Sequence, residues 1–455
     1  MRDGRAGGAL SIVLHTHMPY VEGYGTWPFG EEWLWEAIAT CYLPLLDLLD
    51  GGAPVTVSLT PVLCDQLARE DIAPRFARFV SEVRRATHES DRDAFLAAGE
   101  GALAAQIEVS WEEYRAAASA LERRGGDLRA AFAPYAAWTS AATHAVLPLV
   151  SCDELTRVQL DVGVASHRER FGAWRGGFWL PECAHAAWLD GQLADTGVRA
   201  TCVELTALFG AGAGAHLTPL RSAAGPLLVP VDRATIDLVW GAGGYPAAGA
   251  YRDRHRLTPR HHRPWNNDGA PYDPAAAAAL AAVHAADFVA RVRARLAGAG
   301  GGLVVCALDT ELLGHWWHEG VQWLGAVVAE SGRQGLALLA LDDALEGVDA
   351  AAAPGHLPPT SWGMHNDLST WSTGPASEMA FALRAAELRA VAAHAGGAAL
   401  RELLALQSSD WAFAVARDVA APYGRERHAL HLRELDAALA GERIAGPRSL
   451  APGLA

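Results

Sequence analysis

Short apolar runs rich in β-branched residues recur along the first three quarters of the chain, and several of them end in polar side chains. The run at residues 11–17 ends in His15 and His17, and the run at residues 303–308 is followed at once by Asp309. Runs of this length and composition are typical of buried strands. They predict strands at residues 11–17, 55–60, 135–140, 199–204, 303–308 and 335–342, a strand that ends at Glu182, and a hairpin within residues 226–240.

Between these runs, apolar residues follow helical spacing. The pattern predicts helices at residues 31–49 and 274–297, and a longer helical insertion rich in Arg, Glu and Ala at residues 65–131. Strands that alternate with helices favour an α/β fold, and polar groups at successive strand ends favour a parallel barrel, whose catalytic groups gather at that edge. Residues 245–272 show no periodicity, which indicates a long loop of the functional or disordered kind.

The pattern changes after residue 345. A stretch rich in Ala and Pro is typical of a linker, and residues 377–440 follow helical spacing with almost no strand signal. We therefore expect two domains. The first is the barrel over residues 1–345, including the insertion at 65–131, and the second is a C-terminal helical domain with its linker over residues 346–455.

Charge and cysteine content narrow the class of protein. The 455 residues carry a formal charge of −15 at pH 7, spread without long acidic runs, which argues against a nucleic acid partner. The six cysteines form no CxxC pair, which favours free thiols. The apolar part of residues 1–14 is too short for a membrane span, so we expect a cytoplasmic protein without a membrane partner, in an oligomeric state that the pattern does not specify.

Glu182 and Asp309, at the ends of two predicted strands, are the pair of acids that glycoside chemistry requires. One carboxylate attacks or supports the anomeric carbon, and the other protonates the leaving oxygen. The chain also has 16 tryptophans, many of them near these strand ends. Flat indole rings in a cleft can stack on the apolar faces of sugars, although aromatic residues on helices more often fill a core.

The histidines leave a metal site open as a minor alternative. His15 and His17 share one face of a strand, and His315 and His318 share a helical face. The chain has no HExxH motif, no Cys/His quartet and no phosphate-binding glycine loop. We therefore expect no metal and no cofactor, and a metal-dependent deacetylase ranks last among the candidate functions.

Several segments together resemble glycoside hydrolase family 57, most closely its α-1,4-glucan branching enzymes. The segments that carry the resemblance span nearly the whole chain: LHTHMPY, ATHAVLPLV, FWLPECAH, ALDTELLGHWWHEG, SWGMHNDLSTW and, near the C-terminus, RELLALQSSDWAF. The resemblance implies an incomplete (β/α)7 barrel with a helical insertion and a C-terminal helical domain. It also implies a retaining enzyme that acts on an α-glucan, with Glu182 as nucleophile and Asp309 as general acid/base.

The resemblance further implies a set of substrate-binding residues. They are His15, His17, His144, Trp27, Trp316, Trp362, Asp367 and Trp371.

Branching, hydrolysis and 4-α-glucan transfer remain open at this point. Family branching enzymes usually carry a longer loop after the fifth strand, with a tyrosine that covers the cleft, whereas residues 210–225 here are short and contain no tyrosine. Exclusion of water separates transfer from hydrolysis in such a site. A 4-α-glucanotransferase or α-amylase-type hydrolase with the same acids is therefore an alternative, as is a non-catalytic glucan-binding protein.

Overall fold

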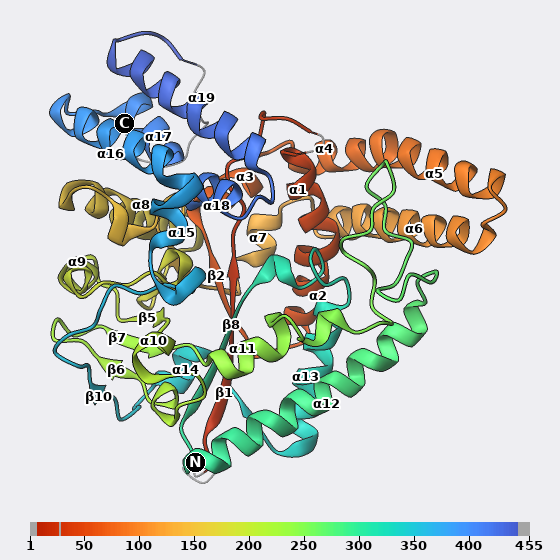
Figure 1. The fold of residues 1–455 in the computed structure, drawn as a ribbon, viewed down its shortest axis with the longest axis horizontal. Helices are drawn as coiled ribbons and strands as arrows, with labels where there is room; N and C mark the ends of the chain where they lie inside the picture. Colours follow the sequence, from red (N-terminus) through yellow and green to blue (C-terminus); the bar gives the residue numbers. More distant parts are fainter. Residues whose placement is uncertain (1–6, 27–28, 445–455) are drawn as a thin grey trace.

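The computed structural model describes residues 7–26 and 29–444. Its centre is a curved sheet in which seven parallel strands run in the order expected of an incomplete barrel (Figure 1). These strands are β1 (Ala9–Thr16), β2 (Thr56–Leu59), β3 (Ala136–Ser140), β4 (Gly177–Trp179), β5 (Ala200–Val203), β7 (Leu227–Pro230) and β8 (Leu303–Asp309). The predicted fold class, an incomplete parallel (β/α)7 barrel with added helices, is confirmed.

The sheet neighbours follow the order β7, β5, β4, β3, β2, β1, β8. Just past the end of β7, Asp232 N donates a 2.8 Å hydrogen bond to Val305 O of β8, so the two ends of the curved sheet meet. All residues of β1 and all of β8 before Asp309 are buried. Burial on both faces explains why these strands read as continuous apolar runs.

Helices cover the outside of the barrel and form the insertion. The segment predicted as one helix at residues 31–49 forms α1 (Glu31–Ala37), a π-helical turn (Ile38–Tyr42) and α2 (Leu43–Asp50). The predicted insertion consists of α3 (Pro61–Leu67), α4 (Ile72–Arg78), α5 (Arg85–Ala97), α6 (Gly101–Arg123) and α7 (Leu128–Phe132). Figure 1 shows α5 and α6 side by side, extending away from the barrel.

The remaining barrel helices follow the later strands. They are α8 (Asp153–Phe171), α9 (Asp190–Thr196), α10 (Thr206–Phe209), α11 (Arg233–Trp240), α12 (Pro274–Ala299), α13 (Gly320–Gln334) and α14 (Leu341–Leu345). Among the described residues, α12 is the helix long and apolar enough to cross a membrane. It packs on α13 and β8 and carries Arg291, Arg293 and Arg295 in its last turns, as expected of a barrel helix.

Two predicted strand assignments are wrong in part. The segment predicted as a hairpin, residues 226–240, forms one strand, β7, followed by α11. The hairpin partner of β7 is β6 (Leu220–Arg221), which lies before the predicted segment. Ile236 and Val239 are buried three residues apart, the spacing of a helix face. The strand predicted at 335–342 is reduced to β9 (Ala337–Leu338), because Leu341 already begins α14.

The C-terminal part is helical, as predicted, with α15 (Ser369–Ser372), α16 (Ser377–Ala392), α17 (Gly397–Leu406), α18 (Ser409–Ala416) and α19 (Ala421–Leu439). Residues 346–376 lead from the barrel to these helices. Within this segment β10 (Ala351–Ala352) pairs with β6, so the segment joins the edge of the sheet. Figure 1 shows α16, α17 and α19 together at one end of the molecule.

Candidate active site

Sheet register brings polar residues from three neighbouring strands together. His15 of β1 lies opposite Asp309 of β8 on one side and opposite Ser58 of β2 on the other. All three residues stand at or near the carboxyl ends of their strands, where a parallel barrel gathers its reactive groups. The two runs that the sequence singled out, at residues 11–17 and 303–308, therefore deliver their polar ends to the same place.

Three histidines form a stack at this edge. The ring centroids of His17 and His144 are 4.0 Å apart, and those of His15 and His144 are 4.8 Å apart. Burial lowers the pKa of His15 and of His144 well below the usual range, so both rings are neutral. A neutral ring has one N–H donor and one acceptor nitrogen, which fits the 2.8 Å contact between the two Nε2 atoms.

Glu182 follows β4, and each of its carboxylate oxygens accepts a hydrogen bond. The Trp362 indole N–H donates to Oε2 at 2.9 Å, and the Ser409 hydroxyl donates to Oε1 at 3.0 Å. The Ser409 oxygen lies 2.9 Å from His144 Nδ1, so the histidine pair is hydrogen-bonded through Ser409 to the acid. Two donors aimed at both oxygens favour an ionised carboxylate held in one orientation.

Asp309 has a different environment from Glu182. It is the exposed residue at the end of an otherwise buried strand. Among the described residues, no side chain forms a hydrogen bond to its carboxylate. Its electrostatic neighbours are His17 and Asp410, and its own charge acts on Glu182. Asp309 is therefore free to reach a ligand in the cleft while Glu182 is held in place.

Desolvation by the surrounding protein raises the pKa of both acids, that of Glu182 to about 8 and that of Asp309 to about 6, although solvent still reaches the Asp309 side chain. The charges of Asp309 and Asp410 raise the pKa of Glu182 further, whereas its two hydrogen-bond donors oppose the rise. Two neighbouring acids with raised pKa values tend to share one proton near neutral pH. Glu182 has the larger rise in pKa, which by itself would place the shared proton there. Both of its oxygens already accept a hydrogen bond, however, which stabilises the ionised form, so we assign the proton to Asp309.

Three residues of the site have backbone conformations that side chains rarely adopt. His144, Glu182 and Cys183 have φ values of 61°, 61° and 48°. Such a residue costs about 1–3 kcal/mol unless its surroundings hold it, and such residues cluster at functional sites.

C-terminal segments hold these strained turns. Trp362 N donates to Glu182 O at 3.0 Å, and His185 and Thr360 exchange two backbone hydrogen bonds of 2.9 Å. On the other side of the cleft, Ser409 N donates to His144 O at 3.1 Å. The same segments thus fix the backbone at Glu182 and His144 and supply the donors to the Glu182 carboxylate.

The sequence analysis missed Asp410 and Ser409 at the start of α18. Asp410 Oδ2 lies 2.9 Å from His17 Nε2. Although burial favours its neutral form, the charge of His17 and the hydrogen bond to it lower the pKa of Asp410 to about 2. A signal was present, because residues 408–410 are a polar run, Ser-Ser-Asp, directly before an apolar helix.

His17, His144 and Asp410 are the group of described residues that could hold a metal ion. Their ligand atoms lie within 4.8 Å of one another. These atoms already have partners, because His17 bonds Asp410 and His144 bonds His15 and Ser409. The expectation of a metal-free site stays a prediction.

The predicted tryptophans have different placements. Trp316 is 37% exposed and meets Trp240, which is 53% exposed, edge to face at 6.2 Å. Trp362 lies at Glu182, as described above. Trp371 is only 3% exposed and packs against Val146 and Ala184, so it supports the site from behind.

Two more predicted residues complete the list. The Asp367 carboxylate is turned to its own chain, where it accepts a 2.8 Å hydrogen bond from Ser369 N at the start of α15. Trp27 lies outside the described residues. Trp240 is one of the tryptophans that the sequence places near the predicted strand ends, although it was not among the eight predicted substrate-binding residues.

Known proteins resemble this chain over almost its full length. The sequence model of glycosyl hydrolase family 57 matches residues 137–349, and that of the C-terminal domain of 1,4-α-glucan branching enzymes matches residues 377–444. A 1,4-α-glucan branching enzyme of Thermococcus kodakarensis is 31% identical over 94% of this chain and 72% of its own length. A probable 1,4-α-glucan branching enzyme of Mycobacterium tuberculosis is 32% identical over 98% of this chain and 95% of its own length.

Solved structures agree with the sequence comparison. The crystal structure of the family 57 branching enzyme from Pyrococcus horikoshii has a TM-score of 0.87 and 30% identity, covering 95% of this chain and 90% of its own. The helical insertion, the barrel and the C-terminal helices described above are thus shared with a family member of similar size. The chain belongs to glycosyl hydrolase family 57, on the branch of its 1,4-α-glucan branching enzymes.

Proposed function

We propose that this protein is a cytoplasmic 1,4-α-glucan branching enzyme that cuts an α-1,4 chain and joins the cut end to a 6-hydroxyl group. The observation that carries the proposal is the arrangement of Glu182 and Asp309. Two hydrogen-bond donors hold the Glu182 carboxylate, Asp309 is exposed at the end of β8, and the charge of Asp309 raises the pKa of Glu182. A held carboxylate and a free acid are the two groups that retaining glycoside chemistry needs.

In the first step, Asp309 donates its proton to the glycosidic oxygen as the bond to C1 breaks. A Glu182 oxygen attacks C1 and forms a glycosyl ester, while the leaving chain departs with a new hydroxyl. Because Trp362 and Ser409 donate to the Glu182 oxygens, they stabilise its carboxylate before attack and fix the attacking atom.

In the second step, Asp309 is a carboxylate and acts as the base. It removes the proton from the 6-hydroxyl of an acceptor glucan, whose oxygen attacks C1 and releases Glu182. The products are the shortened donor chain, which left in the first step, and an acceptor glucan with a new branch, and both acids return to their original protonation states. The proton that Asp309 gave to the leaving group is thus recovered from the acceptor.

The surrounding residues have the groups that bind a sugar. The stacked rings of His15, His17 and His144 form the wall beside the sugar at the bond that breaks. Their nitrogens bond one another and Ser58, Thr60, Ser409 and Asp410, which hold the rings in place. The exposed rings of Trp316 and Trp240 offer an aromatic surface on which a glucan chain can stack. A structure of the T. kodakarensis branching enzyme contains glucose, which agrees with a saccharide as ligand of this fold.

Incubation with amylose tests the proposal directly. We expect new α-1,6 linkages, detected as short chains after debranching, with little reducing sugar released. The matched control is Glu182→Gln, which should yield neither product. Reducing sugar without branch points would instead show a hydrolase. This alternative needs a test because the short loop at residues 210–225 lacks a tyrosine that could cover the site. Longer unbranched chains would show a 4-α-glucanotransferase.

A further inference from the structure

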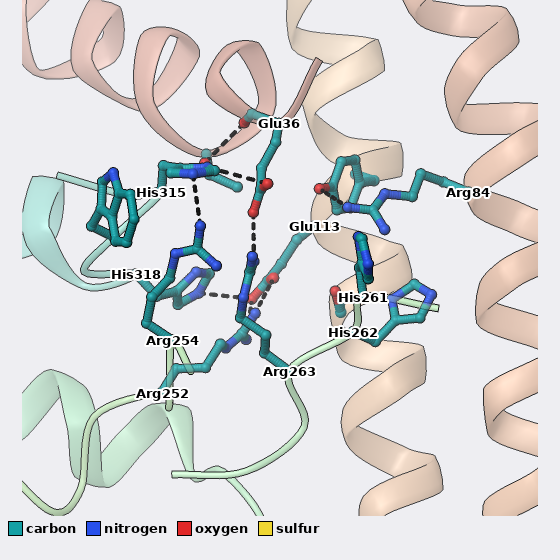
Figure 2. Close-up of a pocket in the computed structure, with 15 residues that line it drawn as sticks. Glu36, Arg84, Glu113, Arg252, Arg254, His261, His262, Arg263, His315 and His318 are labelled. Atoms are coloured by element: carbon teal, nitrogen blue, oxygen red, sulfur yellow. Dashed lines mark hydrogen bonds and ion pairs between the residues drawn. The ribbon is translucent and has the colours of Figure 1, made fainter. Parts of the chain in front are cut away.

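A second pocket lies between the helical insertion and the loop that follows α11. Figure 2 shows the side chains of this loop pointing toward α1 and α6, with the guanidinium groups of Arg252, Arg254 and Arg263 gathered at the centre. We call it the arginine pocket. Its charged and imidazole-bearing lining residues are Glu36, Arg84, Glu113, Arg252, Arg254, His261, His262, Arg263, His315 and His318.

Two of the arginines form ion pairs with carboxylates. Arg252 donates two hydrogen bonds to Glu113, of 3.1 and 3.0 Å, and Arg263 donates one to Glu36 at 2.5 Å, while the Nε atoms of both arginines have no acceptor. Both glutamates of the pocket lining are thereby paired, and each pair neutralises its charges.

Arg254 has no carboxylate partner among the described residues. Its guanidinium donates to His315 Nε2 at 2.9 Å and lies 4.4 Å from the centre of the Trp316 ring. Its Nε atom is buried without a hydrogen-bond acceptor. Burial, with the neighbouring charge of Arg263, lowers the pKa of Arg254 to about 10, so the side chain is still a cation at neutral pH.

Arg84 is a second buried cation of the lining, and unlike Arg254 it is stabilised, because Tyr114, Glu32 and Glu36 raise its pKa against the effect of burial. It is 4% exposed, it donates to the Tyr114 hydroxyl at 2.9 Å, and its closest carboxylate oxygen, on Glu32, is 3.4 Å away. The Arg84 Nε atom also has no acceptor. Burial raises the pKa of Glu32, which weakens it as a counter-charge.

The charges of the pocket therefore do not balance. Its lining has four arginines against two glutamates; two further acids, Glu32 and Glu319, lie outside the lining beside Arg84 and Arg252, so the unmatched charge is that of Arg254. This excess occurs in a chain whose formal charge is −15. The His315 ring does not change the balance, because burial lowers its pKa and its Nε2 accepts from Arg254. A buried cation without a counter-charge is costly, so the pocket is built for an anion.

The size of the pocket limits that anion. A water-sized sphere can move through about 30 Å³ of it, which is two to three times the room that one water needs. A tetrahedral oxyanion fits this space and a whole sugar ring does not. Several N–H donors converging from different directions match the oxygens of a phosphate group.

We propose that the arginine pocket binds a phosphate group, either free inorganic phosphate or a phosphate ester carried by a sugar or glucan, with Arg254 as its principal ligand. The proposal goes beyond branching activity and does not depend on it. The pocket also adjoins the exposed tryptophans, because the Trp316 ring contacts both Arg254 and Trp240.

Isothermal titration calorimetry with inorganic phosphate tests the proposal. We expect saturable binding to the wild-type protein at constant ionic strength set with chloride, and at least tenfold weaker binding to Arg254→Gln, the loss that one charge-assisted hydrogen bond accounts for. The matched control is Arg256→Gln, because Arg256 belongs to the same loop, stacks on Trp265 at 4.0 Å and does not line the pocket. This control should bind phosphate as the wild type does.

The source of the phosphate is distinguished by a second ligand. A maltooligosaccharide with a 6-phosphate that binds more tightly than inorganic phosphate, with the gain lost in Arg254→Gln, assigns the pocket to a glucan ester. Equal affinities, both weakened in Arg254→Gln, assign it to a free anion.

Two results would overturn the proposal: no phosphate binding beyond the chloride control, or equal affinity in the wild type and Arg254→Gln. Circular dichroism and the melting temperature establish that the variant is folded. If it is not, Arg254→Lys takes its place, since it keeps the charge and loses the planar fork. Binding to a folded Arg254→Lys should be severalfold weaker, and unchanged binding there also contradicts the proposal.

Discussion

The cleft and the arginine pocket lie on either side of one short segment, yet their electrostatics are opposite. In the cleft, Glu182 and Asp309 are acids without an arginine partner, and burial raises the pKa of both. In the pocket, arginines outnumber carboxylates, and the pKa of Glu36 is held well below its usual range by Arg263 and His315 against the effect of burial. Residues 309–318 contribute to both regions.

The comparison teaches that the neighbours of a buried group decide how it can be used. A buried acid that faces another acid keeps a proton that it can give and take, which suits catalysis. A buried acid beside arginine stays ionised and holds structure. A partly buried arginine without a carboxylate in ion-pair contact, such as Arg254, holds a charge that a ligand can neutralise. Substitutions of the cleft acids and of Asp410 test the cleft, and the phosphate titration tests the arginine pocket.

The largest effect is expected from removing either acid of the cleft. Glu182→Gln removes the proposed attacking oxygen, and we expect a loss in kcat of about 10⁴-fold or more. Asp309→Asn removes the proposed proton donor, and we expect a loss of about 10²- to 10⁴-fold. Chain transfer on amylose is the measurement. Asp195→Asn is the control, because Asp195 is exposed and pairs only with Arg157 on the surface. Activity retained by Glu182→Gln would contradict its role as nucleophile.

A smaller effect is expected from Asp410→Asn, which leaves His17 without its anionic partner. The 2.9 Å contact between them orients the imidazole in the cleft. We expect kcat/KM to fall about 10- to 100-fold, the loss typical of a positioning contact, with a melting temperature lowered by several degrees. Wild-type kinetics in this variant would show that the pair serves stability alone.

The pH dependence tests the raised pKa of Asp309. An ordinary aspartic acid has lost its proton at pH 6, whereas Asp309, with a pKa of about 6, is still protonated in about half of the molecules at that pH. Because the first step needs this proton, kcat/KM should fall as the pH rises above about 6. The residual activity of Asp309→Asn should lack this alkaline decline. An alkaline limb that survives in Asp309→Asn would assign the acid to another residue.

The smallest effect is a gain in stability. The pKa values of Glu182 and Asp309 rise from usual values of 4.5 and 3.8 to about 8 and about 6, so the folded pair of acids binds a proton more tightly than the unfolded pair does. The stability contributed by the pair is fully present below pH 3.8 and is lost as the pH rises through 6 to 8. Glu182→Gln removes one of the two charges, so at pH 8 its free energy of unfolding should exceed that of the wild type by roughly 1–2 kcal/mol, with little difference at about pH 4. Thermal unfolding at both pH values provides the measurement, and an equal shift at both would contradict the titration account.

Much of the barrel could be predicted because its strands are buried on both faces. β1, β2, β3, β5 and β8 lie within about two residues of the predicted runs, since a strand buried on both sides is apolar throughout. The predictions failed where this signal is weak. Residues 233–240 contain apolar residues that suit either a strand or a helix, and only the contacts of Ile236 and Val239 with the core decided for α11.

The sequence by itself determined which acids stand at strand ends. A buried strand is an apolar run, and the first acid after the run marks the end of the strand. It did not determine which groups hold those acids. Ser409 and Trp362 reach Glu182 from segments that are 227 and 180 residues away along the chain, and Arg254 meets His315 across 61 residues. Hydrogen bonds and pKa values depend on distances of a few ångströms between such distant segments. Local patterns do not encode those distances, and only the packed tertiary structure decides them.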